Sequence, residues 1–278
     1  MKNKKSMIVS ILIVFLAIAI SSALVYTQPS TPVDNVNQVQ KAQVREVHQP
    51  LLDPPVLNLF ADDIKIVAMG DSLTKGVGDP TGRGGYLRFL KKDLLHSGNF
   101  NSINITNLGV TGLRSDELIK RLDREKYREA LTSADQIYIT IGGNDLVKIM
   151  YNNIMSLTIT PFMAETEPYG KRIETILKET RKINKAAPIF LIGMYNPFSK
   201  FFKDIDEMNT IVKTWDSESR SIVQQFDNIT FIPIRDIFLD TSDNLLYEDN
   251  FHPNVDGYKR IATRVDTYVE QALDTSDE

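Results

Sequence analysis

Close to its N-terminus the chain carries an uncharged apolar run, Met7 to Tyr26, which follows three lysines within the first five residues. At about 1.5 Å per helical residue, a run of roughly twenty residues just spans the hydrocarbon core of a bilayer. No Lys or Arg follows until Lys41, so the positive-inside rule leaves the N-terminus in the cytoplasm and exports the remainder. We therefore expect residues 1–27 to form cytoplasmic lysines followed by a membrane anchor or signal segment.

Whether this run is cleaved depends on the residues near its end. Ser21-Ser22-Ala23 offers small side chains of the kind that a signal peptidase requires. The run continues through Leu24-Val25-Tyr26 and is longer than a usual signal-peptide core, which favours an uncleaved anchor. The expected location is therefore extracytoplasmic and anchored to the cell membrane, with secretion after cleavage as the alternative.

Residues 28–62 show little hydrophobic periodicity and are rich in Pro, Gln, Asn, Val and Asp. A segment of this composition does not bury enough apolar surface to fold alone. We expect it to be an extracytoplasmic tether between the membrane and a folded domain.

From residue 63 the pattern changes to short apolar runs that alternate with amphipathic stretches. Five runs are rich in β-branched residues and predict buried strands, within 64–69, 103–108, 136–141, 189–194 and 229–234. Between them, apolar positions at three-and-four spacing predict helices, most clearly from Met208 to Phe226. Ser115 is predicted to cap another helix. The alternation predicts a parallel sheet with helices on both faces over residues 63–274, followed by an acidic tail at 275–278.

Composition narrows the chemistry that this domain can use. The 278 residues are 42% hydrophobic and 24% charged, enough for a sizeable core, and allow one large domain or two small ones. The net charge of −4 argues against nucleic-acid binding. The absence of cysteine excludes a disulfide scaffold, a thiolate nucleophile and a Cys-ligated zinc site.

Polar or glycine residues gather where four predicted strands end or the last helix begins. Such loops, at the carboxyl ends of parallel strands, are where open α/β sheets bind their ligands. The four segments are Gly70-Asp71-Ser72-Leu73, Asn107 to Gly112, Gly142-Gly143-Asn144-Asp145 and Asp249 to Pro253.

Residues in these four segments supply the parts of an acyl-transfer site. Ser72 offers a hydroxyl nucleophile, and His252 is the histidine placed to act as its base. Asp249, three residues earlier, can orient the imidazole. The Asn144 amide, with the backbone N–H groups of Gly112 and Ser72, can donate to an oxyanion. The alternative for Ser72 alone is a structural role in the turn.

Together, in this order and ending in Asp-x-x-His-Pro, these segments resemble the conserved blocks of the SGNH (GDSL) hydrolase superfamily. The resemblance covers about Ile64 to Leu273 and is greatest to bacterial membrane-anchored GDSL lipase/acylhydrolase-like proteins. It implies a flavodoxin-like three-layer α/β/α sandwich with a parallel five-stranded sheet, and a serine esterase or lipase that needs no metal or organic cofactor. The family's catalytic residues correspond to Ser72, Asp249 and His252, and its oxyanion-hole residues correspond to Ser72, Gly112 and Asn144.

The stretch from Asp145 to Tyr169 is long for a simple connection, and either a lid or a helix at the domain edge would account for it. Aromatic residues also follow the fourth predicted strand. We expect apolar residues from both places to line the substrate pocket, namely Met150, Phe162, Phe198 and Phe201.

Other function classes were weighed against an acyl hydrolase. A nucleotide-binding domain is disfavoured because residues 70–76 lack the P-loop pattern and Gly76-x-Gly78 lacks its third glycine. A catalytically silent surface-binding module remains open, as does an O-acetyl esterase or acyltransferase acting on cell-wall carbohydrate. The expected partners are an acyl ester and, through the N-terminal segment, a membrane. The sequence does not indicate which oligomeric state the protein adopts.

Overall fold

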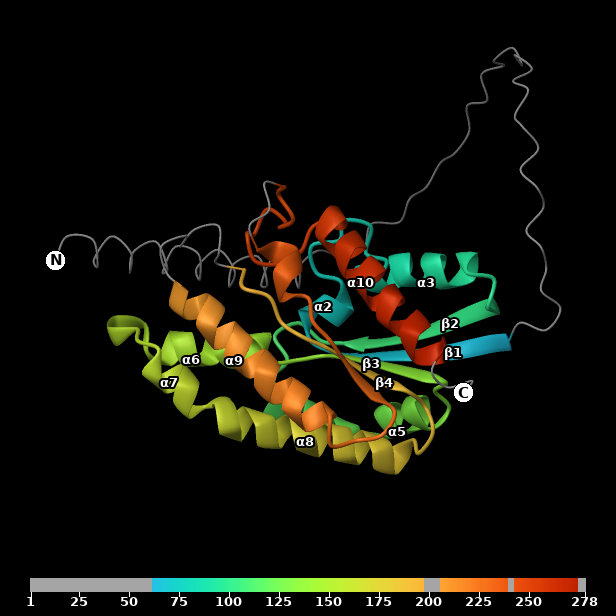
Figure 1. Ribbon diagram of the computed structural model, residues 1–278, viewed down its shortest axis with the longest axis horizontal. Helices are drawn as coiled ribbons and strands as arrows, with labels where there is room; N and C mark the ends of the chain where they lie inside the picture. The colour runs from blue at the N-terminus through green and yellow to red at the C-terminus, as the bar shows by residue number, and fades with distance from the viewer. Residues whose placement is uncertain (1–61, 198–205, 240–242, 275–278) are drawn as a thin grey trace, which may run out of the picture. The chain divides into compact units, whose positions relative to one another are not determined.

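The computed structural model describes residues 62–197, 206–239 and 243–274 (Figure 1). Five strands form one parallel sheet in the order β2-β1-β3-β4-β5. They are β1 (Asp62–Gly70), β2 (Phe100–Gly109), β3 (Gln136–Thr140), β4 (Ile189–Ile192) and β5 (Ile229–Ile232). This confirms the predicted parallel five-stranded sheet, and the order is the one found in flavodoxin-like folds.

Burial along the strands follows their position in the sheet. Every residue of β3 and β4 is buried, as expected for central strands covered by helices on both faces. In β2, at the sheet edge, Ser102, Asn104 and Thr106 are exposed, whereas Ile103 and Leu108 are buried. The fully apolar strands therefore lie at the centre of the sheet, and the strand with alternating polar residues lies at its edge.

Helices cover both faces of the sheet. Figure 1 shows α3 and α10 on one face and α5, α8 and α9 on the other. In chain order the helices are α2 (Ser72–Lys75), α3 (Tyr86–His96), α4 (Ser115–Leu122), α5 (Glu125–Thr132), α6 (Gly143–Asn152), the 3-10 turn η1 (Ile154–Ser156), α7 (Thr160–Ala164), α8 (Thr166–Ile183), α9 (Asp206–Val223), the 3-10 turn η2 (Arg235–Phe238) and α10 (Val255–Asp274).

One continuous apolar core lies between the sheet and the α3–α10 pair. Leu90 of α3 and Ile261 of α10 are almost completely buried in the same cluster as Ile66 of β1 and Ile232 of β5. On the other face, the rings of Tyr169 (α8) and Trp215 (α9) stack with their centroids 4.3 Å apart. Burial of each such large side chain contributes roughly 1.5–3 kcal/mol to stability, and this holds the helices on both faces of the sheet.

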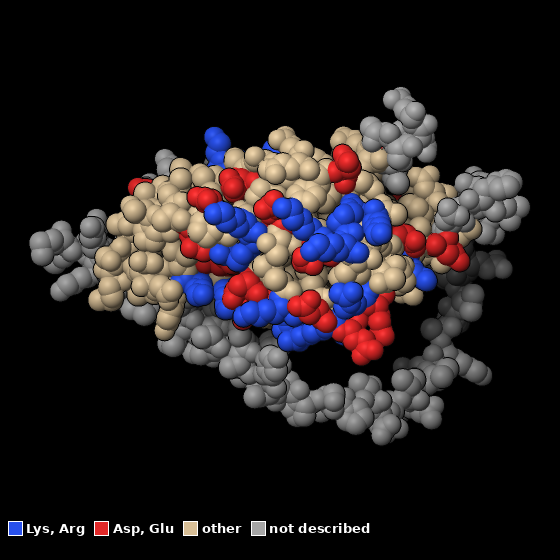
Figure 2. Space-filling view, turned by 90° about the horizontal axis from the view of Figure 1, so that it is seen from below, with Lys and Arg blue, Asp and Glu red and all other residues tan. Residues whose placement is uncertain are grey.

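The outer surface of α8 carries charges of both signs, interspersed on the face seen in Figure 2. Lys171 pairs with Glu167, and Lys178 with Glu174, each four residues apart on one helix face. Such exposed pairs contribute little to stability, because water screens the charges, and they keep the helix surface solvated.

Two sequence predictions need comment. Ser115 does not cap α4, because Arg114 occupies the cap position and Ser115 is the first helical residue, with its side chain directed at Asp145. The segment from Asp145 to Tyr169 folds into α6, η1, α7 and the start of α8.

In the part of the chain that the structure describes, none of the helices has the length and apolar character needed to cross a membrane. The predicted membrane segment at 7–26, the tether up to residue 61 and the acidic tail lie outside the described residues.

Candidate active site

The first part of the site is the turn after β1. Gly70 has φ +132°, and a Cβ there would overlap the carbonyl oxygen of Thr140 on β3, so only glycine fits. The Asp71 N–H donates to that same carbonyl at 3.0 Å, and the Asp71 side chain caps α2 by accepting from Leu73 N at 3.0 Å. Ser72 is thereby fixed as the first residue of α2 and is 5% exposed.

The second part is the loop that precedes α10. The bridge between Leu246 and Pro253 closes this loop, and Asn250 turns the chain with φ +54°. Asp249 Oδ1 accepts from the backbone N–H groups of Phe251 and His252, both at 2.9 Å. These two bonds orient the carboxylate so that its other oxygen meets the imidazole.

Three side chains form a hydrogen-bonded series across the two parts. Asp249 Oδ2 lies 2.6 Å from His252 Nδ1, and His252 Nε2 lies 2.9 Å from Ser72 Oγ. An ionised carboxylate only accepts, so Nδ1 carries the proton, Nε2 is the acceptor and the Ser72 hydroxyl donates to it. This arrangement can remove the proton from Ser72 as the hydroxyl attacks an electrophile.

Electrostatics differ at the two carboxyl groups of this region. At Asp249 burial acts to raise the pKa, but hydrogen bonds and charge attraction from His252, with the two backbone N–H groups, outweigh it and lower the pKa. At Asp71 burial dominates and raises the pKa to about 6, despite the hydrogen bonds from the Thr140 hydroxyl and Leu73 N. Asp249 is therefore held ionised, whereas ionisation of Asp71 is costly.

Besides Ser72, the predicted oxyanion residues are Asn144, at the start of α6, and Gly112, in the loop after β2. Asn144, the second residue of α6, lines the same pocket as Ser72, and its Nδ2 donates to the carbonyl of Leu113 at 3.0 Å. That amide nitrogen carries a second hydrogen for another acceptor. Gly112 directly precedes Leu113, is exposed with φ +77°, and is not among the residues that line the pocket.

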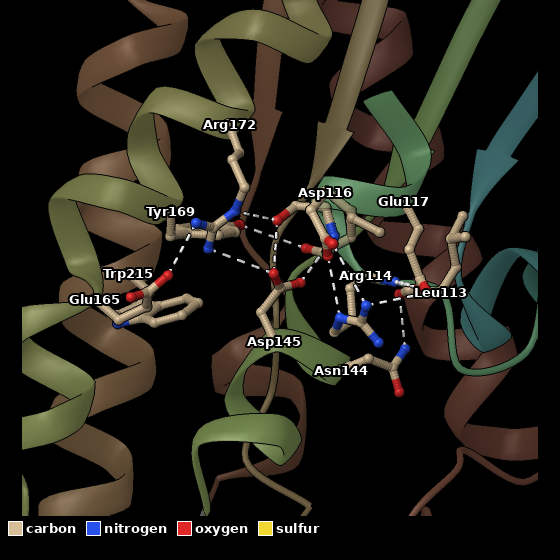
Figure 3. A network of polar contacts seen from close by, with 12 residues as sticks. Leu113, Arg114, Asp116, Glu117, Asn144, Asp145, Glu165, Tyr169, Arg172 and Trp215 are labelled. Carbon is tan, nitrogen blue, oxygen red and sulfur yellow. Dashed lines mark hydrogen bonds and ion pairs between the residues drawn. The ribbon is translucent and has the colours of Figure 1, made fainter. Parts of the chain in front are cut away.

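A polar network behind Asn144 was not predicted from the sequence (Figure 3). Asp145 accepts from Ser115 N at 3.0 Å and from Ser115 Oγ at 2.6 Å. Arg172 of α8 donates through Nε to Ser115 Oγ at 2.6 Å and through Nη1 to Glu165 at 2.9 Å, and its Nη2 lies 3.5 Å from Asp145. We call Ser115, Asp145, Glu165 and Arg172 the Asp145 network.

The pocket beside Ser72 is largely apolar. Helices α6 and α9 and the segment after β4 form most of its wall, together with Ser72, Asn144 and His252. The apolar lining residues are Leu73, Ile141, Leu146, Val147, Met150, Met194, Tyr195, Pro197, Met208, Val212 and Phe251.

The four predicted pocket residues have different outcomes. Met150 does line the pocket. The prediction for Phe162 is wrong: its side chain is buried in the core, 1% exposed, and its carbonyl accepts from the indole N–H of Trp215 at 3.1 Å. An apolar residue on a short helix serves packing as well as binding, and spacing does not distinguish the two. Phe198 and Phe201 lie outside the described residues.

Over the ranges 62–197, 206–239 and 243–274, no three His, Asp or Glu side chains are grouped so that they could hold a metal ion.

Comparison with known proteins places this chain in a family. Residues 68–260 match the model of the GDSL-like Lipase/Acylhydrolase family. The uncharacterized protein YpmR of Bacillus subtilis (strain 168) is 37% identical over 206 residues, which cover 73% of this chain and 80% of YpmR. The spore germination lipase LipC of Bacillus licheniformis is 23% identical over 209 residues, covering 73% of this chain and 94% of LipC.

Solved structures share the fold. The lipase Lip_vut3 from a goat rumen metagenome superposes with a TM-score of 0.65 at 22% identity, over 73% of this chain and 95% of the lipase. The acetylxylan esterase Axe2 of Geobacillus stearothermophilus gives a TM-score of 0.57 at 19% identity, over 74% of this chain and 93% of the esterase. The family match, the relatives and the parallel sheet agree: this chain belongs to the GDSL-like lipase/acylhydrolase family of ester-hydrolysing enzymes.

Proposed function

We propose that the chain is a serine acyl hydrolase of the esterase or lipase type, with Ser72, His252 and Asp249 as its catalytic triad. One observation carries the proposal: His252 lies between Ser72 Oγ at 2.9 Å and Asp249 Oδ2 at 2.6 Å, with a different ring nitrogen facing each. Nucleophile, base and orienting carboxylate are thus within hydrogen-bond reach in the order that acyl transfer requires.

In the first half of the reaction Ser72 Oγ attacks the ester carbonyl carbon while its proton passes to His252 Nε2. Asp249 stabilises the imidazolium that forms. The carbonyl oxygen becomes an oxyanion, and the donors proposed for it are the N–H groups of Ser72 and Gly112 and the Asn144 amide. As the tetrahedral intermediate collapses, His252 returns the proton to the alcohol that leaves, and the acyl group remains on Ser72.

In the second half, water takes the place of the alcohol. His252 removes a proton from the water as the water oxygen attacks the acyl-serine, and the same donors stabilise the second oxyanion. Collapse releases the carboxylic acid and restores the Ser72 hydroxyl. If another alcohol enters instead of water, the same steps make an acyltransferase.

The acyl chain is proposed to occupy the apolar pocket beside Ser72. Its lining by Val147, Met150 and Val212 fits a hydrocarbon better than a sugar ring, which needs polar partners. The relative LipC, described as a lipase, supports the same substrate class. Preference for acetyl esters over longer chains would instead favour deacetylation of cell-wall carbohydrate.

The proposed location is the outer side of the cell membrane, with residues 1–27 as the anchor, 28–62 as the tether and 63–274 as the hydrolase domain. The apolar run at 7–26 and the three lysines before it support this organisation.

The test of the function is Ser72→Ala, with Ser217→Ala of the exposed surface of α9 as the matched control. We expect Ser72→Ala to lower kcat on p-nitrophenyl esters by about 10⁴-fold or more. A fluorophosphonate probe should label the wild type and the control, and should fail to label Ser72→Ala. Turnover by folded Ser72→Ala close to the wild-type rate would overturn the triad.

A further inference from the structure

We infer that Arg172 of α8 is a positioning residue for the oxyanion hole, because it holds together the two loops that carry Gly112 and Asn144. The inference rests on the proposed function, since it assigns a role relative to the oxyanion of that reaction. Arg172 does not line the pocket and reaches the proposed donors only through Ser115 and Asp145.

The sheet itself leaves these two loops unconnected. Gly112 follows β2 and Asn144 follows β3, and β1 lies between those strands in the sheet order. The ends of β2 and β3 are therefore two strand spacings apart, about 9–10 Å, with no ladder hydrogen bond between them. Backbone bonds tie each strand end to β1, and beyond those ends side-chain hydrogen bonds hold the segments of the two proposed donors together.

Two sets of hydrogen bonds join the loops. Asn144 Nδ2 donates to the carbonyl of Leu113, and Asp145 accepts from both Ser115 N and Ser115 Oγ. Asp145 is the neighbour of Asn144 in the chain, and Ser115 follows the Gly112 turn by three residues. Movement of either partner would change the separation between Gly112 N–H and the Asn144 amide.

Arg172 supports the second set. Its side chain is 22% exposed and its guanidinium contacts Ser115, Asp145 and Glu165 from three of its nitrogens (Figure 3). Burial raises the pKa of Asp145, which the Ser115 hydrogen bonds and the Arg172 charge oppose. Without Arg172, the buried carboxylate would lose its cation and Ser115 Oγ would lose a donor, so the link between the loops would loosen.

A loosened link should affect the transition state more than substrate binding. Donors to an oxyanion form their strongest hydrogen bonds only when the negative charge develops, so their displacement lowers kcat and leaves KM nearly unchanged. A role of Arg172 in fold stability alone would instead lower the melting temperature without changing kcat.

The experiment compares Arg172→Gln with Arg181→Gln. Arg181 lies on the same helix and donates to the carbonyls of Ala187 at 2.8 Å and Asn228 at 3.0 Å, far along α8 from the Asp145 network. We expect Arg172→Gln to lower kcat about 10–10²-fold with KM within about twofold of the wild-type value. This decrease in kcat is smaller than the decrease of about 10²–10³-fold that follows complete loss of one oxyanion donor. Arg181→Gln should lower the melting temperature and keep kcat.

A double-mutant cycle tests whether Arg172 acts through the donors. In the Asn144→Ala background, Arg172→Gln should lower kcat by clearly less than its effect of about 10–10²-fold in the wild type, because one of the two donors whose separation it sets is gone. Arg172→Lys should recover part of the rate, since a lysine supplies the charge but not the guanidinium geometry. Should Arg172→Gln not fold, Ser115→Ala removes the Oγ bonds to Asp145 and Arg172 with a smaller change, and it should likewise lower kcat while KM stays nearly unchanged.

Two results would overturn the inference: a folded Arg172→Gln or Ser115→Ala with wild-type kcat, or multiplicative losses in the cycle. Either result leaves the proposed function intact, because that depends on Ser72→Ala. Activity retained by Ser72→Ala would contradict the proposed function and the inference together.

Discussion

Two carboxyl groups lie next to the hydrogen bond between Ser72 and His252, and they differ in what holds them. Asp249 receives the imidazole N–H and two backbone N–H groups, which outweigh its burial and lower its pKa. Asp71 is more deeply buried, and the Thr140 hydroxyl and Leu73 N–H do not prevent its pKa from rising to about 6. The same side-chain type therefore serves as an ionised partner at one position and as a cap at the other.

Asp249→Asn should lower kcat by about 10²–10⁴-fold, because the amide neither stabilises the imidazolium nor selects the required tautomer. The lowered pKa also stabilises the fold at neutral pH, and this contribution is lost as pH falls through the folded-state pKa. The melting-temperature difference between wild type and Asp249→Asn should therefore be largest above about pH 4 and shrink at lower pH. Equal kcat values for the two proteins would show that Asp249 is not the partner of His252.

Asp71→Asn should have the opposite pH dependence. The folded-state pKa of Asp71 is raised, so the folded protein holds more protons than the unfolded chain between about pH 4 and 6, and stability falls as pH rises through that window. The amide still accepts from Leu73 N and Thr140 Oγ1 but does not ionise. We expect a gain of up to about 3 kcal/mol relative to wild type at pH 8 and little gain at pH 4, measured by thermal unfolding.

Residue chemistry also explains which site residues could be predicted. Ser72, Asn144, Asp249 and His252 stand in short polar segments at strand or helix ends, where few residue types fit and their chemistry is complementary. Arg172 stands among the charged residues of α8, which alternate with apolar ones as on any solvated helix face. Its role depends on contacts between distant segments, which a periodic pattern does not record.

At the scale of elements, α6 carries both a proposed oxyanion donor and part of the pocket wall. Its first turn carries Asn144. Val147, about one turn later, and Met150, nearly two turns later, line the apolar pocket together with Val212 of α9. The strands and the main helices could be predicted because their apolar patterns extend over enough residues to show a period or a continuous run. The short α7 could not, and this is why Phe162 was assigned to the pocket instead of the core.

Val147→Phe should narrow the acyl pocket. Val147 is half-buried, so a larger ring can enter the pocket without crowding the core. Each excluded methylene forfeits about 0.8 kcal/mol, so kcat/KM for an octanoyl ester should fall about 10–10²-fold while that for an acetyl ester stays within about threefold. Ile149→Phe is the matched control, because Ile149 is also half-buried on α6 but does not line the pocket. Unchanged octanoyl activity in Val147→Phe would place the acyl chain elsewhere.

At the scale of the whole molecule, the candidate site lies at the end of the sheet opposite to the one where the described chain begins. The chain enters the sheet at Asp62, the first residue of β1, and the site lies beyond the other end of that strand, about 30 Å away.

An uncharged segment with exposed apolar side chains lies beside the pocket. No charged residue occurs between Lys148 and Glu165, and Tyr151 and Met155 in this stretch are 67% and 80% exposed. The stretch continues from α6 directly after Met150 of the pocket wall. Apolar side chains beside the pocket would contact the hydrocarbon of an acyl substrate more favourably than charged side chains would.

The last prediction tests the proposed anchor in the full-length chain. After cell fractionation the protein should sediment with membranes, resist extraction by high salt, and lose its C-terminal domain to protease added outside the cell. Ile13→Arg combined with Ile18→Arg should release it or block its export, since each charge near the centre of a spanning helix costs about 2.5–3.5 kcal/mol. The matched control, Ile13→Leu with Ile18→Leu, keeps the apolar run and should behave as wild type. A soluble protein whose N-terminus begins near Leu24 would show a cleaved signal, and a protease-protected domain in intact cells would contradict export.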